Sequence, residues 1–133
     1  MNNKAPRPLA EAVEYCPTSS WRIIQNEEIL LLDVREDEEV EQLRFDVPNY
    51  LHIPLSQLEQ RFHEVPEEQS VIVACLHGVR SLKATYFLSY QGYQNVANMK
   101  LGLTRWVEKG FPVIGDPELV KSGDAGGNTG CCC

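Results

Sequence analysis

Residues 70–81 read Ser70-Val-Ile-Val-Ala-Cys75-Leu-His-Gly-Val-Arg-Ser81, and this stretch decides the fold. The apolar run 71–74 is typical of a strand that is buried on both faces of a parallel sheet. A short loop that contains a glycine follows Cys75, and a helical pattern begins after it at Leu82–Tyr90. A strand, a tight loop and a helix in this order indicate the repeating unit of an α/β fold.

The place of Cys75 between strand and helix makes it the candidate reactive group. A loop that leads into a helix N-terminus aims backbone N–H groups at one point, and the helix dipole adds positive potential there. An electropositive and partly exposed position of this kind holds a cysteine sulfur as thiolate, which is its reactive form. We therefore predict that Cys75 is a nucleophile.

Further strands and helices alternate on both sides of this unit. The patterns predict strands near 12–16, 29–34, 52–54, 71–74 and 94–99, and helices that begin near residues 17, 36, 55, 82 and 101. This alternation predicts a parallel α/β sheet. From Asp116 the composition becomes rich in glycine and polar residues, which cannot bury a core. We expect one domain at 12–115, between a flexible arm at 1–11 and a flexible tail at 116–133.

Composition limits the partners and the compartment. The chain has 133 residues and a net charge of −7, which argues against binding to nucleic acid or to an anionic membrane surface. Its start lacks the apolar segment of a signal peptide, and no apolar run approaches a membrane span. Five cysteines are an odd number, and three of them end the chain. A disulfide framework is therefore not expected, and the sequence predicts a protein of the reducing cytoplasm.

Five motifs in order resemble a known family. They are Ile29-Leu-Leu-Leu-Asp-Val-Arg-Glu, His52-Ile-Pro, Val71-Ile-Val-Ala-Cys-Leu-His-Gly-Val-Arg-Ser, Gly92-Tyr-Gln-Asn-Val and Gly102-Leu-Thr-Arg-Trp with Gly110-Phe-Pro-Val. Together, over roughly residues 12–115, the chain resembles a single-domain rhodanese, a sulfurtransferase.

The resemblance implies a three-layer α/β/α fold around a five-stranded parallel sheet. It also implies that Cys75 takes a sulfane sulfur from a small-molecule donor, such as thiosulfate or a persulfide, and passes it from a Cys75 persulfide to a thiol, a protein or cyanide. No metal or organic cofactor is implied. By position, the loop consists of Leu76, His77, Gly78, Val79 and Arg80, and Ser81 starts the helix. Asp33 and Arg35 match the family's Asp-Val-Arg and are expected to support the loop.

Other activities remain open at this stage. The fold is similar to that of cell-cycle phosphatases and arsenate reductases, which also use a loop cysteine. Their loop has five residues between cysteine and arginine, whereas four separate Cys75 from Arg80, so sulfur transfer is favoured. A further alternative is a non-catalytic, rhodanese-like binding module, for which Cys75 would do no chemistry. Leu76 stands where thiosulfate-using members often carry a basic residue, which weakens the case for thiosulfate as donor.

The C-terminal cysteines allow several interpretations. Cys131, Cys132 and Cys133 would form a thiol relay if the tail reaches Cys75, since about fifteen flexible residues span roughly 20 Å. Clustered thiolates also bind soft metals such as Cu(I) or Zn(II), which would make the tail a redox or metal-thiol module. Terminal cysteine pairs are also prenylated in some proteins, although the chain lacks a polybasic partner. The remaining alternative is a tip without function.

Overall fold

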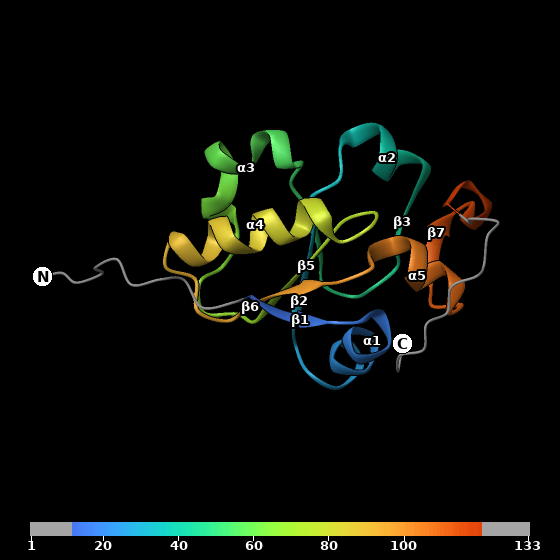
Figure 1. Ribbon diagram of the computed structural model, residues 1–133, viewed down its shortest axis with the longest axis horizontal. Helices are drawn as coiled ribbons and strands as arrows, with labels where there is room; N and C mark the ends of the chain where they lie inside the picture. Colours follow the sequence, from blue (N-terminus) through green and yellow to red (C-terminus); the bar gives the residue numbers. More distant parts are fainter. Residues whose placement is uncertain (1–11, 121–133) are drawn as a thin grey trace, which may run out of the picture.

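The computed structural model describes residues 12–120, and Figure 1 shows their arrangement. Its elements, in chain order, are β1 (Val13–Tyr15), α1 (Pro17–Asn26), β2 (Leu30–Asp33), α2 (Asp37–Gln42), β3 (Leu43–Phe45), β4 (Tyr50–His52), α3 (Leu55–Arg61), the 3-10 helix η1 (Phe62–Glu64), β5 (Val71–Ala74), α4 (Val79–Tyr90), β6 (Val96–Met99), α5 (Gly102–Glu108), β7 (Val113–Gly115) and the 3-10 helix η2 (Pro117–Val120). The expected arm at 1–11 and the terminal cysteines lie outside the described residues.

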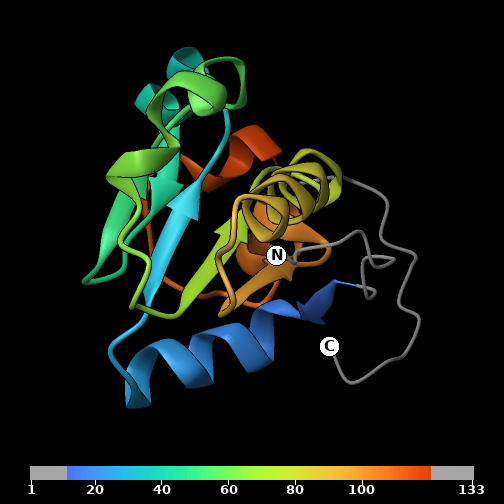
Figure 2. The same ribbon diagram turned by 90° about the vertical axis from the view of Figure 1, so that its left-hand side faces the viewer.

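Five of the strands form a parallel sheet in the order β1-β6-β5-β2-β4. The central pair is β2 and β5, in which Leu30 lies opposite Val71 and Asp33 opposite Ala74. Figure 2 shows their arrowheads pointing the same way, so the residues that follow both strands meet at one edge of the sheet. The predicted five-stranded parallel sheet is confirmed.

Helices cover both faces of this sheet. On the face of α3 and α4, Leu32 and Val73 pack with Leu88. On the face of α1 and α5, Leu31 and Ile72 pack with other buried side chains, among them Ile24 and Trp106. Alternate residues of each central strand therefore enter different cores, as the pleat of a strand requires. Figure 1 shows α4 above the sheet and α1 below it, which confirms the three layers.

Some features differ from the sequence prediction. A second sheet pairs β3 with β7 in antiparallel fashion, with Arg44 opposite Ile114, and the sequence gives no sign of it. Helix α4 begins at Val79, earlier than the expected Leu82. The range 116–133, which its composition assigns to a flexible tail, begins with the short helix η2, whose Val120 packs against the core. Within residues 12–120, no helix is long and apolar enough to span a membrane.

Candidate active site

The sulfur of Cys75 lies at the centre of the loop between β5 and α4. It accepts hydrogen bonds from the backbone N–H groups of Gly78 and Ser81, each at 3.2 Å. In addition, the thiol donates to the Ser81 hydroxyl oxygen at 3.3 Å. Ser81 is the third residue of α4, and the first N–H groups of a helix have no partner within the helix. The start of α4 therefore supplies a hydrogen bond to the sulfur.

The burial of Cys75 corrects one expectation. The sequence predicts a partly exposed sulfur, but Cys75 is only 1% exposed and packs among the side chains of the α3 and α4 core. The difference arises because the loop closes over the sulfur: its N–H groups turn inward, and Gly78 and Ser81 are themselves buried. A reagent that reaches the sulfur must enter the loop.

Gly78 gives the loop its shape. It precedes α4 with φ 92°, a left-handed conformation that glycine adopts readily. A Cβ atom at this position would lie 2.8 Å from the backbone nitrogen of Leu101. The loop and the β6–α5 connection therefore pack backbone against backbone, and a side chain at Gly78 would separate them.

Helix α5 holds the outer side of the loop. The backbone N–H groups of Leu103 and Thr104 donate to the carbonyl oxygens of Cys75 and Leu76, at 2.9 and 3.1 Å. Gly102 permits this approach, because a Cβ there would lie 2.5 Å from the Cys75 carbonyl oxygen. With the carbonyl groups fixed outward on α5, the loop N–H groups remain free to face the sulfur.

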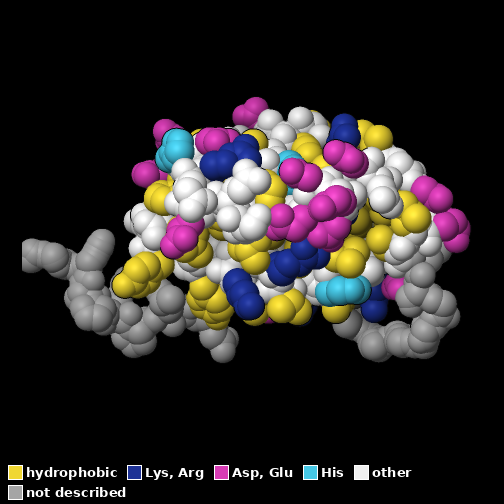
Figure 3. All heavy atoms as spheres, turned by 90° about the horizontal axis from the view of Figure 1, so that it is seen from above, with side chains coloured by type: hydrophobic (Ala, Val, Ile, Leu, Met, Phe, Trp, Pro, Cys, Tyr) yellow, Lys and Arg dark blue, Asp and Glu magenta, His cyan; other side chains and the backbone are white. Residues whose placement is uncertain are grey.

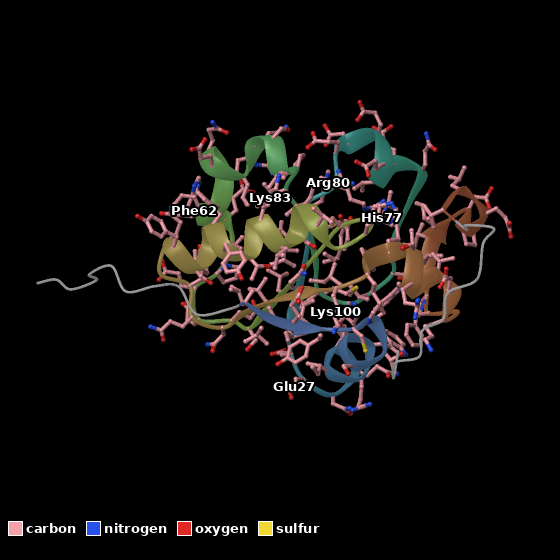
Figure 4. The ribbon with its side chains drawn as sticks, viewed as in Figure 1. Glu27, Phe62, His77, Arg80, Lys83 and Lys100 are labelled. Atoms are coloured by element: carbon pink, nitrogen blue, oxygen red, sulfur yellow. The ribbon has the colours of Figure 1, made fainter. Side chains whose placement is uncertain are left out.

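Arg80 reaches from the start of α4 to α2. Its guanidinium forms two hydrogen bonds with the Glu39 carboxylate, at 2.8 and 2.9 Å. These bonds raise the pKa of Arg80 and lower the pKa of Glu39. Figure 4 shows Arg80 near the start of α4, close to α2. Arg80 therefore forms a salt bridge to a carboxylate of helix α2.

Asp33 and Arg35 form a buried ion pair beyond the end of β2. Two hydrogen bonds, at 3.0 and 2.8 Å, join the Arg35 guanidinium to the Asp33 carboxylate. Arg35 also donates to the carbonyl oxygen of Leu43 at 2.8 Å, and the Tyr50 hydroxyl donates to Asp33 at 2.7 Å. Burial alone lowers the pKa of Arg35, but its bonds with Asp33 outweigh that effect and raise it. The pair thus ties the end of β2 to β3 and β4.

The remaining predicted loop residues differ in exposure. His77 and Val79 are exposed, and Leu76 is half-buried against the α1 and α5 core. Figure 4 shows His77 on the loop, above α5. The face shown in Figure 3 carries acidic side chains close to Lys and Arg. The first turn of α2 contains three acidic residues, Asp37, Glu38 and Glu39. The positive charge of Arg80 is balanced by Glu39 of this helix.

Sequence reasoning missed Asn98. This residue of β6 is fully buried, and its amide oxygen accepts a 2.5 Å hydrogen bond from the Ser81 hydroxyl. Its amide nitrogen donates to the Gly78 carbonyl oxygen at 3.2 Å and to the Glu14 carboxylate at 2.8 Å. A polar residue inside an otherwise apolar strand must find partners in the core, and that signal was present in the sequence.

Known proteins resemble this chain in sequence and in fold. A rhodanese-like domain model matches residues 17–109. A protein named sulfurtransferase from Allochromatium vinosum is 33% identical over 95 residues, which cover 71% of this chain and 87% of that protein. A thiosulfate sulfurtransferase GlpE from Actinobacillus pleuropneumoniae is 32% identical over 101 residues, which cover 75% of this chain and 91% of that protein.

Solved structures agree with these relatives. The solution structure of a polysulfide-sulfur transferase homodimer from Wolinella succinogenes has a TM-score of 0.70 at 27% identity, covering 80% of each chain. A rhodanese-related protein from Thermoplasma volcanium has a TM-score of 0.67 at 28% identity, covering 79% of this chain and 98% of that chain. Both the fold and the sequence therefore place this chain in the rhodanese-like domain family.

Proposed function

We propose that the protein is a sulfurtransferase that carries sulfur as a persulfide on Cys75. The observation that carries this proposal is the pair of backbone N–H groups, from Gly78 and Ser81, at 3.2 Å from the sulfur. Donors that are fixed in this way stabilise negative charge as it develops in a reaction. The names of the matching relatives support the general activity, and the geometry supports Cys75 as the reacting residue.

The proposed reaction has two exchange steps. First, the Cys75 thiolate attacks the outer sulfur of a donor such as thiosulfate or a persulfide. A sulfur–sulfur bond forms to Cys75, the donor's own bond to that sulfur breaks, and sulfite or a thiolate leaves with the electron pair. Second, a thiolate or cyanide attacks the outer sulfur of the Cys75 persulfide, and the Cys75 thiolate is released. The charge is balanced in both steps, and no oxidant is consumed.

The inner and the outer side of the loop both contribute to this chemistry. On the inner side, the N–H groups face the sulfur and compensate the charge of the thiolate and of the persulfide. On the outer side, α5 binds the carbonyl groups of Cys75 and Leu76 and keeps them away from the anion. The loop therefore meets the demands of both steps without moving a charged side chain.

Cys75→Ala tests the proposed function. We expect wild-type protein to form thiocyanate from thiosulfate or a persulfide and cyanide, and the variant to lose this activity to background. Removal of residues 131–133 serves as the matched control, because it deletes three other cysteines and keeps Cys75. Equal background rates in wild type and Cys75→Ala would show that the protein does not transfer sulfur to cyanide, as expected for a binding module.

Mass spectrometry of the intact protein and of its peptides measures the added sulfur and locates it. After exposure to the donor, wild-type protein should gain the mass of one sulfur atom on the peptide that contains Cys75. In the Cys75→Ala variant this gain should be absent. A gain that persists in that variant and disappears on removal of residues 131–133 would assign the carrier role to the terminal cysteines instead.

A further inference from the structure

Asn98 contacts both residues that donate to the sulfur. Its amide oxygen binds the Ser81 hydroxyl at 2.5 Å, and its amide nitrogen binds the Gly78 carbonyl oxygen at 3.2 Å. Gly78 and Ser81 are also the residues whose N–H groups reach Cys75. One buried side chain on the neighbouring strand β6 therefore contacts both of the residues whose N–H groups donate to the sulfur.

Glu14 fixes the orientation of this amide. Glu14 lies directly opposite Asn98 in the β1–β6 register, and its carboxylate accepts from the Asn98 amide nitrogen at 2.8 Å. The nitrogen thus faces two acceptors, while the oxygen faces the Ser81 hydroxyl. A flipped amide would place its oxygen against the Glu14 carboxylate and the Gly78 carbonyl, so only one orientation satisfies all three contacts.

The two residues differ sharply in exposure. Asn98 is fully buried, whereas Glu14 is exposed on β1, an edge strand of the sheet. Glu14 has no contact with Cys75 in the hydrogen bonds described above and reaches it only through Asn98. The Glu14 carboxylate presents an acceptor oxygen 2.8 Å from the Asn98 amide nitrogen, and this acceptor holds the amide in place.

We propose that Glu14 and Asn98 form a positioning pair that keeps the N–H donors of the loop aimed at the Cys75 sulfur. The inference rests on the proposed function for its place in catalysis. Neither residue touches the sulfur, so both act through Gly78 and Ser81. Loss of the pair leaves the donors less well fixed, and groups that support a reactive centre from behind typically contribute measurably to its rate.

Two substitutions at Glu14 separate the hydrogen bond from the charge. Glu14→Gln keeps an acceptor oxygen at the same reach and removes the charge, whereas Glu14→Ala removes both. We expect Cys75 of Glu14→Ala to be alkylated by iodoacetamide about three- to tenfold more slowly than Cys75 of wild type. The rate of Glu14→Gln should stay within about twofold of wild type. Glu27→Ala is the matched control, since Glu27 is an exposed glutamate away from the loop (Figure 4), and it should be unchanged.

Alkylation of Cys75 by iodoacetamide decides this proposal. The rate is followed on the Cys75 peptide by mass spectrometry, at one pH and for every variant, and it needs no sulfur transfer. Thiocyanate formation is measured in parallel and tests the proposed function. If wild type forms no thiocyanate but alkylation slows only in Glu14→Ala, the proposed function fails and the positioning pair stands.

Two results would overturn the positioning pair. One is equal alkylation rates in Glu14→Ala and wild type. The other is a Glu14→Gln variant as slow as Glu14→Ala, which would assign the effect to charge. Asn98→Ala adds a further test: Glu14→Ala should cause no additional loss in that background, and an additive loss would contradict the proposed chain of contacts. If Asn98→Ala does not fold, the two Glu14 variants still decide.

Discussion

The Asp33–Arg35 pair is a residue-scale feature on which we expect the stability of the fold to depend. Both side chains are almost fully buried, at 0% and 2% exposure. We expect Asp33→Ala to lower the free energy of unfolding by about 3–5 kcal/mol, because the Arg35 guanidinium would stay buried without its carboxylate. Urea denaturation followed by circular dichroism measures this change.

An exposed ion pair supplies the control for that experiment. Glu64 binds Arg61 at 2.9 Å on the surface, where water screens the two charges. Glu64→Ala should therefore leave the free energy of unfolding almost unchanged. If Asp33→Ala proved as mild as Glu64→Ala, the buried pair would contribute little to the stability of the fold.

At the same scale, the sequence points to Cys75 as the candidate nucleophile but not to the residues that surround it. Cys75 is recognisable because it stands between an apolar run and a glycine loop, a local signal. Its near-complete burial is not local, since it depends on how the loop folds back over the sulfur. Glu14 and Asn98 are 84 residues apart in the chain and meet only through the register of β1 with β6, which no local pattern encodes.

Among the elements, the β5–α4 loop and the β6–α5 connection make a close backbone contact near the site. We expect Gly78→Ala to destabilise the protein and to slow thiocyanate formation, because the new Cβ would lie 2.8 Å from the Leu101 nitrogen and force the two segments apart. The measurements are the urea midpoint and the transfer rate.

Gly92→Ala is the matched control for Gly78→Ala. Gly92 also has a positive φ, of 105°, but a Cβ there would meet nothing within 4 Å. It should show only the backbone strain of a left-handed alanine, about 1–2 kcal/mol, and retain the transfer rate. Similar losses of activity in both variants would mean that strain, and not the contact with Leu101, controls the loop.

Element by element, the long apolar strands and the helices that follow them are predictable from sequence, because periodicity and capping are local. The β3–β7 sheet is not. Each of its strands has three residues, too few for an alternating pattern, and β3 begins at Leu43 directly after α2 ends at Gln42. Their pairing joins residues about seventy positions apart, so tertiary contacts alone define it.

Across the whole molecule, the Arg80–Glu39 bridge joins α4 to α2 and makes stability depend on pH. The hydrogen bonds from Arg80 lower the pKa of Glu39 below its usual 4.5. The stability that this shift contributes is therefore present above about pH 4.5 and is lost as the pH falls through the lowered value. Glu39→Gln should show a smaller loss of unfolding free energy than wild type on acidification, by at most about 1 kcal/mol because the pair is partly exposed.

Urea denaturation at a series of pH values between about 6 and 3 measures this difference. Glu38→Gln is the control, since Glu38 is an exposed carboxylate on the same helix and its substitution removes the same charge. Wild type and Glu38→Gln should follow similar curves, while Glu39→Gln should be flatter. Parallel curves for all three proteins would exclude a contribution from the bridge.

The burial of the Cys75 sulfur has consequences for its oxidation and, in the proposed reaction, for the group that can accept sulfur from it. Peroxides attack accessible thiolates first, so a thiol with 1% exposure is protected from them. In the proposed reaction, the transferred sulfur atom would lie about 2 Å beyond the Cys75 sulfur, the length of a sulfur–sulfur bond. An acceptor in that reaction would have to extend a slender group into the loop, and a thiol on a long, flexible chain end meets that geometric demand better than one set flat on a broad protein surface.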